Sequence, residues 1–291
     1  RWTADYLQEK GVRINYQSIG SGAGIQQLLA GTVDFGASDA PMSDDELSRA
    51  PRPVLHIPTT LGAVAVAYNL PDLQQPLRLS GDVVADLFLG RITRWNDPRI
   101  AATNPDVTLP DEPVLVIHRS DGSGTTYVFT EYLSVVSPTW ASGPGTGKEV
   151  SWPTGIGAKG DEGVAAQIKS SPGTVGYVEV VFANQLDLST AALQNRSGSF
   201  VAPSAGAPTA AAAGIVDTLS ESTDYRISII NAPGEGAYPV SSFSWILIYR
   251  DQPAAELARR IAWASVIGAG LQFLVQVPTV LRVTSSLRAS L

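Results

Sequence analysis

A short polar segment, residues 117–126 (IHRSDGSGTT), carries side chains that suit the binding of a small oxyanion. The guanidinium of Arg119 can donate paired hydrogen bonds to an anion, and Asp121 can hold that guanidinium in place. Residues that offer hydroxyl donors or close backbone approach follow directly: Ser123, Gly124 and Thr125. These residue types in this order indicate a site for a tetrahedral anion.

The secondary-structure elements on either side of this segment must position its hydrogen-bond donors. Residues 114–117 predict a buried strand, and the apolar run that opens at Tyr127 predicts a helix. A strand that enters a helix through such a turn points unpaired backbone N–H groups at one place, and the helix dipole adds positive potential there. A lone turn of this kind is a weak signal, since ordinary helix caps look similar.

A second turn of the same kind strengthens the prediction of an anion site. Residues 19–24 (IGSGAG), which include Ser21, lie between a strand-like segment, 12–16, and a helix-like segment, 25–30. A further strand is predicted to end at Ser38, which leaves Asp39 at its carboxyl end. Ligands of open α/β sheets sit outside the carboxyl ends of the strands, so these polar residues are candidates for one site.

More elements follow along the chain. Ser43 and Glu46 form a capping-box signature for a helix. Residues 161–169 and 253–267 predict helices, and residues 172–179 predict a turn and then a strand. This alternation is typical of an α/β protein.

Composition limits the function classes. The chain has 291 residues, 44% of them hydrophobic and 16% charged, so it is long enough for two folded domains. It offers no apolar run of about 18 residues, which argues against a membrane span. The net charge of −7 and the absence of a basic stripe argue against nucleic acid as a partner. With no cysteine and two histidines, we expect no disulfide, no metal site and no cofactor.

A serine hydrolase is the competing enzymatic interpretation, because Ser123 lies in an Asp-Gly-Ser-Gly run. A catalytic serine needs a base within hydrogen-bond reach. Only His56 and His118 are available, and His118 lies on the strand side of the turn. The sequence therefore favours binding over catalysis, and we expect no enzymatic activity.

Six segments, in order along the chain, resemble the PstS-type phosphate-binding proteins, which are the substrate-binding subunits of bacterial phosphate ABC transporters. The segments are 16–21 (YQSIGS), 35–41 (FGASDAP), 89–95 (LGRITRW), 119–125 (RSDGSGT), 172–179 (PGTVGYVE) and 238–248 (YPVSSFSWILI). The resemblance implies an α/β, two-lobed periplasmic-binding-protein fold of type II. Each lobe would be a mixed sheet flanked by helices, and the lobes would be joined by two crossover strands and close over the ligand.

By the same resemblance, one lobe would comprise residues 1–69 and 244–291, and the other residues 70–243. The family begins with a strand and a Gly-rich Thr-Phe loop that supplies further ligand contacts, ahead of the helix that this chain enters at Trp2. We expect the native molecule to contain both, and weaker binding without them.

The family's phosphate ligands, carried over by position, fall on Ser21, Asp39, Arg119, Ser123, Gly124 and Thr125, with Asp121 behind Arg119. Asp39 would decide selectivity. An ionised carboxylate only accepts hydrogen bonds, so it requires a proton on the ligand, which phosphate carries near neutral pH and sulfate does not. An unpaired buried charge of this kind costs at least several kcal/mol, about a thousandfold or more in affinity.

The resemblance therefore implies a monomeric receptor for inorganic phosphate. It would act in the periplasm or outside the cell, with a lipid anchor left open, and deliver phosphate to the permease of an ABC transporter. Two alternatives stay open. The same fold could serve as a receptor or adhesin-like protein without transport, or the site could bind another tetrahedral oxyanion such as sulfate, molybdate or an organophosphate.

Overall fold

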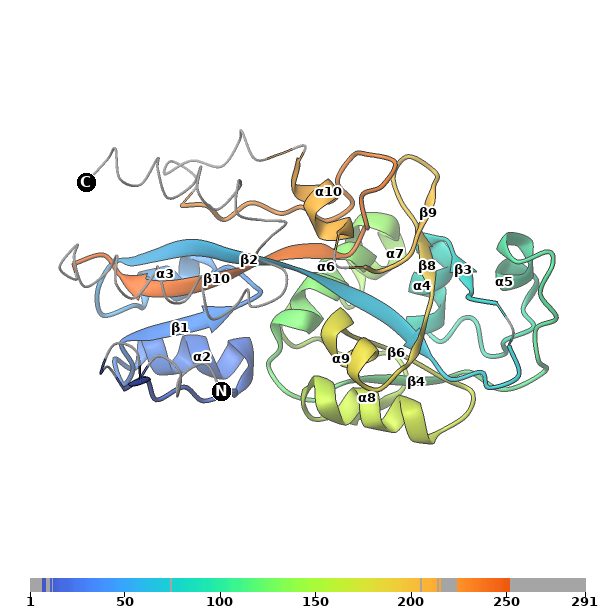
Figure 1. The fold of residues 1–291 in the computed structure, drawn as a ribbon, viewed down its shortest axis with the longest axis horizontal. Coiled ribbons are helices and arrows are strands. Elements are labelled where there is room, and N and C mark those ends of the chain that lie inside the picture. Colours follow the sequence, from blue (N-terminus) through green and yellow to red (C-terminus); the bar gives the residue numbers. More distant parts are fainter. Residues whose placement is uncertain are drawn as a thin grey trace. The chain divides into compact units, whose positions relative to one another are not determined.

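The computed structural model describes residues 7–8, 11, 13–73, 75–204, 206–213, 215 and 224–251 (Figure 1). Its helices are α2 (Gly20–Leu29), α3 (Asp44–Ser48), α4 (Gly81–Phe88), α5 (Pro98–Thr103), α6 (Gly124–Val136), α7 (Pro138–Ser142), α8 (Gly160–Ser170), α9 (Val180–Gln185) and α10 (Ala207–Ala213). Its strands are β1 (Phe35–Ser38), β2 (Val54–Tyr68), β3 (Arg78–Leu79), β4 (Leu115–Arg119), β5 (Ile156–Ala158), β6 (Thr174–Glu179), β7 (Ser189–Thr190), β8 (Ala192–Gln194), β9 (Phe200–Val201) and β10 (Ser241–Tyr249).

The chain divides into two compact units. Unit 1 contains residues 1–60 and 244–291, and unit 2 contains residues 61–243. Both boundaries fall inside strands, so β2 and β10 each run from one unit into the other (Figure 1). Unit 1 is therefore built from two separate parts of the sequence.

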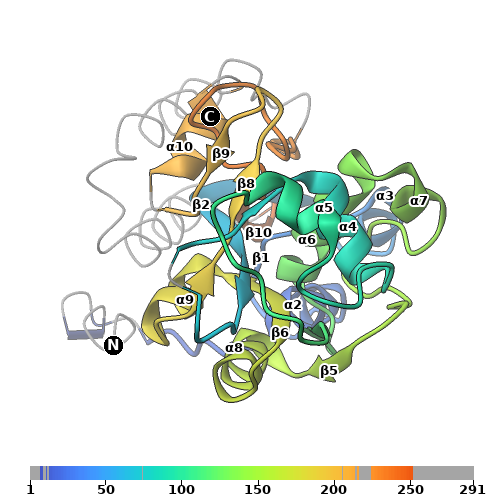
Figure 2. The ribbon, with the colours of Figure 1, turned by 90° about the vertical axis from the view of Figure 1, so that its right-hand side faces the viewer.

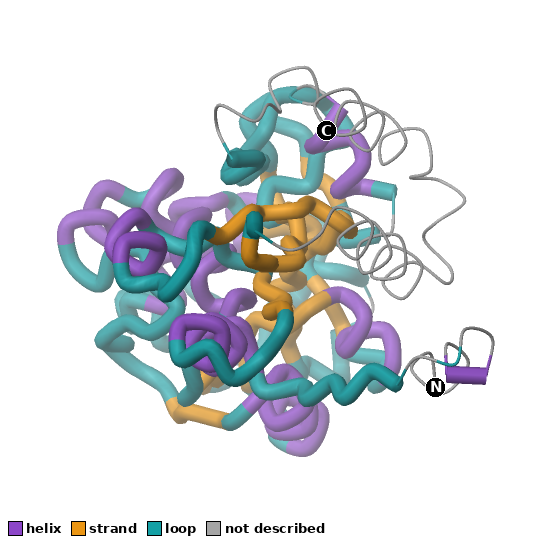
Figure 3. The backbone as a smooth tube through the Cα atoms, turned by 90° about the vertical axis from the view of Figure 1, so that its left-hand side faces the viewer, coloured by secondary structure: helices purple, strands orange, loops and turns teal. Residues whose placement is uncertain are grey.

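The main sheet of unit 2 has the strand order β2-β6-β4-β5. β2 pairs with β6 in antiparallel register, whereas β4 is parallel to both β6 and β5. Parallel neighbours need crossover connections, and here α6, α7, α8 and the loops between them supply these. In Figure 3, where strands are orange and helices purple, strands and helices follow one another along the chain. Because β4, β5 and β6 are parallel, their carboxyl ends meet at one edge of the sheet.

Alternate residues of β2 pack in different core clusters, whose helices α4, α6, α8 and α9 are labelled in Figure 2. Val64 and Val66 of β2 pack in a core cluster with residues of α4 and α6. Ala65 and Ala67 pack in another cluster with residues of α8 and α9. Successive side chains of a strand point to opposite faces of the sheet, so helices cover both faces, as parallel sheets require. The packing leaves no room for a side chain at Gly176, where an added Cβ would lie 2.8 Å from the side chain of Ile168.

Unit 1 contains β1 paired with β10 in antiparallel register, Phe35 opposite Ile248 and Ser38 opposite Trp245. The predicted end of a strand at Ser38 is confirmed. So is the capping box of α3, in which Ser43 accepts from the amide of Glu46 and the Glu46 carboxylate accepts from the amide of Ser43. The capping box depends only on neighbouring residues, whereas the strand also needs its partner β10.

Other predictions were wrong in detail or lie outside the described residues. Residues 13–16 form no strand, although 12–16 were predicted to be one. Alternating apolar residues make a strand only where a partner strand takes up the backbone hydrogen bonds. Tyr16 is instead 57% exposed. The predicted helix 253–267 lies outside the described residues. In the part of the chain that is described, no helix has the length and apolar character needed to cross a membrane.

Candidate functional site

The turn predicted to bind an anion joins β4 to α6 in unit 2. Ser123 is the N-cap of α6, and its hydroxyl accepts from the amide of Thr126 at 3.1 Å. This cap starts the helix at Gly124 rather than at Tyr127, where the sequence predicted it. The amides of Gly124 and Thr125 have no acceptor within the described part of the chain. They are the donors that a helix N-terminus offers to an anion.

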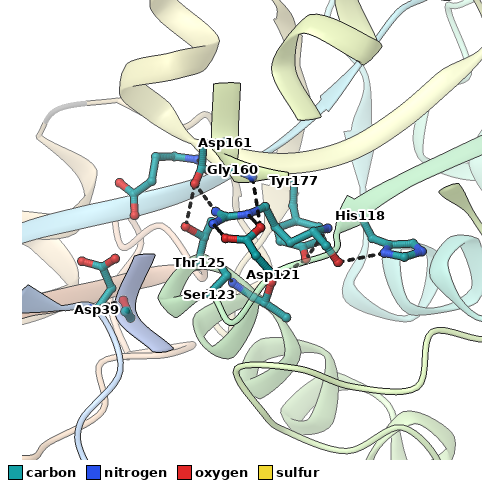
Figure 4. Close-up of polar contacts among 12 residues, drawn as sticks. Asp39, His118, Asp121, Ser123, Thr125, Gly160, Asp161 and Tyr177 are labelled. Atoms are coloured by element: carbon teal, nitrogen blue, oxygen red, sulfur yellow. Dashed lines mark hydrogen bonds and ion pairs between the residues drawn. The ribbon is translucent and has the colours of Figure 1, made fainter. Parts of the chain in front are cut away.

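Arg119 ends β4 beside this helix start, and it is 6% exposed. Its Nε and Nη2 donate to the two carboxylate oxygens of Asp121 at 2.8 and 2.6 Å. Its Nη1 donates to Asp161 (Figure 4). The guanidinium is therefore clamped from two sides. Its other N–H groups, on Nη1 and Nη2, are not used by the contacts in the described residues, so they can serve a ligand.

Asp161 was missed by the sequence analysis. It is 7% exposed, lies at the start of α8, and accepts from Thr125 Oγ1 at 3.2 Å as well as from Arg119. The register of the parallel strands explains its position, because Arg119 of β4 pairs with Ala158 of β5, and α8 begins directly after β5. An acidic residue in the first turn of a helix is common, so nothing local marked Asp161 as a partner of Arg119.

The two carboxylates differ in their electrostatics. The hydrogen bonds from Arg119 lower the pKa of Asp121 against the opposing effect of burial, and the amide of Gly160 adds to the lowering. Burial raises the pKa of Asp161, although Arg119 and the amide of Glu179 oppose that rise. Burial alone would lower the pKa of Arg119, but both carboxylates more than offset it, so the net shift is upward and the guanidinium stays charged.

One guanidinium faces two carboxylates, so this turn carries no net positive charge. Oriented amides, hydroxyls and the unused N–H groups must provide most of the attraction.

Tyr177 of β6 connects the strand to the helix. Its hydroxyl accepts from the amide of Arg119 at 3.1 Å and shares a 2.7 Å hydrogen bond with Thr126 Oγ1. Phe129 of α6 stacks on its ring at 4.5 Å between centroids. Since Tyr177 is fully buried, these contacts fix the end of β4 against the first turn of α6.

The two candidate residues of unit 1 also lie together. Ser21 is the second residue of α2, and its hydroxyl accepts from the amide of Asp39 at 3.2 Å. The hydroxyl of Ser244, on β10, donates to the Asp39 carboxylate. The sequence analysis gave position 244 only as a lobe boundary. The structure thus brings Ser21 and Asp39 together within unit 1, and Arg119, Asp121, Ser123, Gly124 and Thr125 together within unit 2.

The hydrolase interpretation has no support in this geometry. The ring of His118 stacks on Trp152 at 4.8 Å between centroids, and its Nδ1 lies 3.0 Å from the carbonyl oxygen of Arg119. His56 is buried in unit 1, where its Nε2 accepts from the amide of Met42. Ser123 uses its hydroxyl as a helix cap. Each of these groups therefore has a structural contact in place of the contact that a triad requires.

Comparison with known proteins agrees with this fold. A family model described as "PBP superfamily domain" matches residues 1–265. Among solved structures, a human phosphate-binding apolipoprotein superimposes with a TM-score of 0.65 at 19% identity, covering 90% of this chain and 82% of that one. A putative phosphate ABC transporter substrate-binding protein from Clostridium perfringens, with bound phosphate, gives a TM-score of 0.61 at 16% identity, covering 90% and 85%. The predicted α/β fold of periplasmic binding proteins is confirmed.

Relatives found by sequence have a much higher identity to this chain than these solved structures. The phosphate-binding protein PstS of Xylella fastidiosa is 45% identical over 249 residues, which are 85% of this chain and 67% of that protein. The phosphate-binding protein PstS of Pasteurella multocida is 44% identical over 262 residues, 90% of this chain and 75% of that protein. The chain therefore belongs to the PBP superfamily and, within it, to the PstS family of phosphate-binding proteins.

Proposed function

We propose that this protein binds inorganic phosphate and delivers it to the permease of a phosphate ABC transporter, without catalysis. The observation that carries the proposal is the start of α6, where amides without acceptors lie beside a buried, clamped arginine. This arrangement suits a tetrahedral oxyanion. The names of relatives about 45% identical support phosphate as that anion.

In unit 2, phosphate accepts hydrogen bonds from the amides of Gly124 and Thr125, the hydroxyl of Ser123 and the unused N–H groups of Arg119. Asp121 and Asp161 hold the guanidinium in one orientation, so little side-chain entropy is lost when the anion binds. Because the carboxylates also cancel its charge, this turn binds by directed hydrogen bonds, which depend on the geometry of the anion.

In unit 1, we expect Ser21 and Asp39 to take part in binding phosphate. Asp39 acts as the acceptor for a proton of phosphate, and this requirement rejects sulfate. Ser244 donates to Asp39 and so helps to keep its carboxylate in place.

The protein acts in the periplasm or at the outer face of the cell, as a monomer, and its macromolecular partner is the membrane permease. The family membership supports this placement. No contact with nucleic acid is part of the function, in keeping with the net charge of −7.

Isothermal titration of phosphate-stripped protein, first with phosphate and then with sulfate, tests the proposal. We expect tight one-to-one binding of phosphate and no heat from sulfate. Arg94→Ala is a matched control, because Arg94 is an arginine of unit 2 that pairs with Asp111 on the surface, and this variant should bind as the parent does. Absence of phosphate binding by the parent protein would refute the proposed function.

A further inference from the structure

Asp161 links three elements at the candidate site. Its Oδ2 accepts from Arg119 at the end of β4 and from Thr125 in the first turn of α6, and its Oδ1 accepts from the amide of Glu179 at the end of β6, at 2.9 Å. All of these contacts come from donors, as the ionised carboxylate requires. The carboxylate therefore acts as the acceptor in all three contacts.

The contact with Thr125 restricts what that residue offers to a ligand. A threonine hydroxyl has one hydrogen, and Thr125 donates it to Asp161 at 3.2 Å. Thr125 is 3% exposed, so water does not compete freely for that hydrogen. The hydroxyl oxygen keeps its lone pairs, which can only accept. An anion at the start of α6 thus meets the Thr125 side chain as an acceptor, beside the donating amide of the same residue.

We propose that Asp161 is a positioning residue for anion selectivity, which orients the Thr125 hydroxyl so that it accepts a hydrogen bond from a protonated oxygen of the ligand. The inference rests on the proposed function and adds a second proton acceptor to the one assigned to Asp39. Monobasic phosphate, which is abundant near neutral pH, carries a second proton for such an acceptor, whereas sulfate leaves the acceptor without a hydrogen bond. Asp161 then selects for a protonated anion through Thr125 without touching the ligand.

Asp161→Asn is the direct test. The substitution removes the charge that holds the Thr125 hydrogen, and the hydroxyl becomes free to donate to any oxyanion. Glu162→Gln is the matched control, because Glu162 is the next carboxylate on α8 and is exposed. Each protein is stripped of phosphate and titrated with phosphate, and sulfate is then measured by its displacement of bound phosphate.

We expect Asp161→Asn to narrow the ratio of phosphate affinity to sulfate affinity about tenfold, one hydrogen bond's worth, and Glu162→Gln to leave it within about twofold of the parent. An unchanged ratio in Asp161→Asn, or an equal change in both variants, would overturn the inference. Failure of the parent to bind phosphate would instead refute the proposed function, so the two failures are distinguishable.

Thr125→Val keeps the test decisive should Asp161→Asn fold poorly. If the hydroxyl accepts a hydrogen bond from phosphate, its removal weakens phosphate affinity about tenfold. The sulfate affinity, calculated from displacement with this weaker phosphate affinity, should equal that of the parent. Equal weakening of both anions would show a donating hydroxyl and overturn the inference. In a protein that already carries Thr125→Val, adding Asp161→Asn should not change the ratio of phosphate affinity to sulfate affinity, because the hydroxyl through which Asp161 acts is absent.

Discussion

Two turns of similar sequence, one in each unit, place a serine at the start of a helix by different means. In unit 2, Ser123 precedes α6 and caps it with its own side chain. In unit 1, Ser21 lies inside α2, whose N-cap residue Ile19 makes no side-chain cap, and its hydroxyl accepts instead from the amide of Asp39. The same Gly-Ser-Gly pattern therefore stabilises a helix in one unit and holds the end of a strand in the other.

The charges beside the two turns differ as well. The Ser123 turn has a buried guanidinium between two carboxylates. The Ser21 turn has the carboxylate of Asp39 and the hydroxyl of Ser244. One turn can donate strongly to an anion, and the other presents an acceptor. The two turns therefore differ in hydrogen-bonding character, and each of the following variants tests one of them.

Arg119→Ala should have the largest effect. It removes the cation from between Asp121 and Asp161 and leaves one buried and one partly buried carboxylate without a counter-charge, which costs about 3–5 kcal/mol of unfolding free energy. Phosphate binding should be lost with it. Urea unfolding and isothermal titration measure the two effects. Native phosphate affinity in a folded Arg119→Ala variant would place the anion site elsewhere.

Asp39→Asn should leave the stability of the Arg119 turn untouched and act on selectivity alone. An amide can donate to sulfate, so rejection of sulfate should weaken by as much as about a thousandfold. Titration of sulfate in competition with phosphate measures the ratio of the two affinities. Asp45→Asn is the control, because Asp45 pairs with Arg49 on the surface of unit 1. An unchanged preference in Asp39→Asn would remove Asp39 from the site.

The two carboxylates on Arg119 should respond to pH with opposite sign. The pKa of Asp121 is lowered by Arg119, so its contribution is present above the ordinary carboxyl pKa and is lost as the pH falls through the lowered value. The pKa of Asp161 is raised by burial, so stability falls as the pH rises from the ordinary value through the raised one.

Urea unfolding over a pH series from about 3 to about 7 checks this prediction. Asp121→Asn should remove part of the loss of stability on the acid side, and Asp161→Asn should remove part of the decline on raising the pH. Slopes that change in the same direction in both variants would contradict the assignment of the two shifts.

The smallest effects should come from the serines, and their order distinguishes the two turns. At the N-cap position 123, Ala should cost about 1 kcal/mol and Gly only a few tenths, because glycine is tolerated there. At position 21, inside α2, Ala should be better than Gly by up to about 1 kcal/mol. Thermal unfolding of the four variants gives the ranking. The same order at both positions would mean that the turns are equivalent.

Features that depend on neighbouring residues could be predicted from the sequence. Arg119 and Asp121 are two positions apart, and Ser123 caps a helix that follows it directly, so the order of residue types was enough to identify them. The capping box of Ser43 and Glu46 was predicted for the same reason. The fold class followed from the alternation of elements and from resemblance to a family.

The tertiary structure alone decided the rest, because those contacts join distant parts of the chain. Asp161 is 42 positions from Arg119, and Tyr177 is 58 positions from it; both meet it only because β4 lies between β5 and β6. Ser244 reaches Asp39 across 205 positions through the pairing of β10 with β1. The strand predicted at 12–16 was wrong, since local alternation cannot supply a partner strand. The sequence alone therefore determined which residues can bind an anion, and strand register decided which charges surround them.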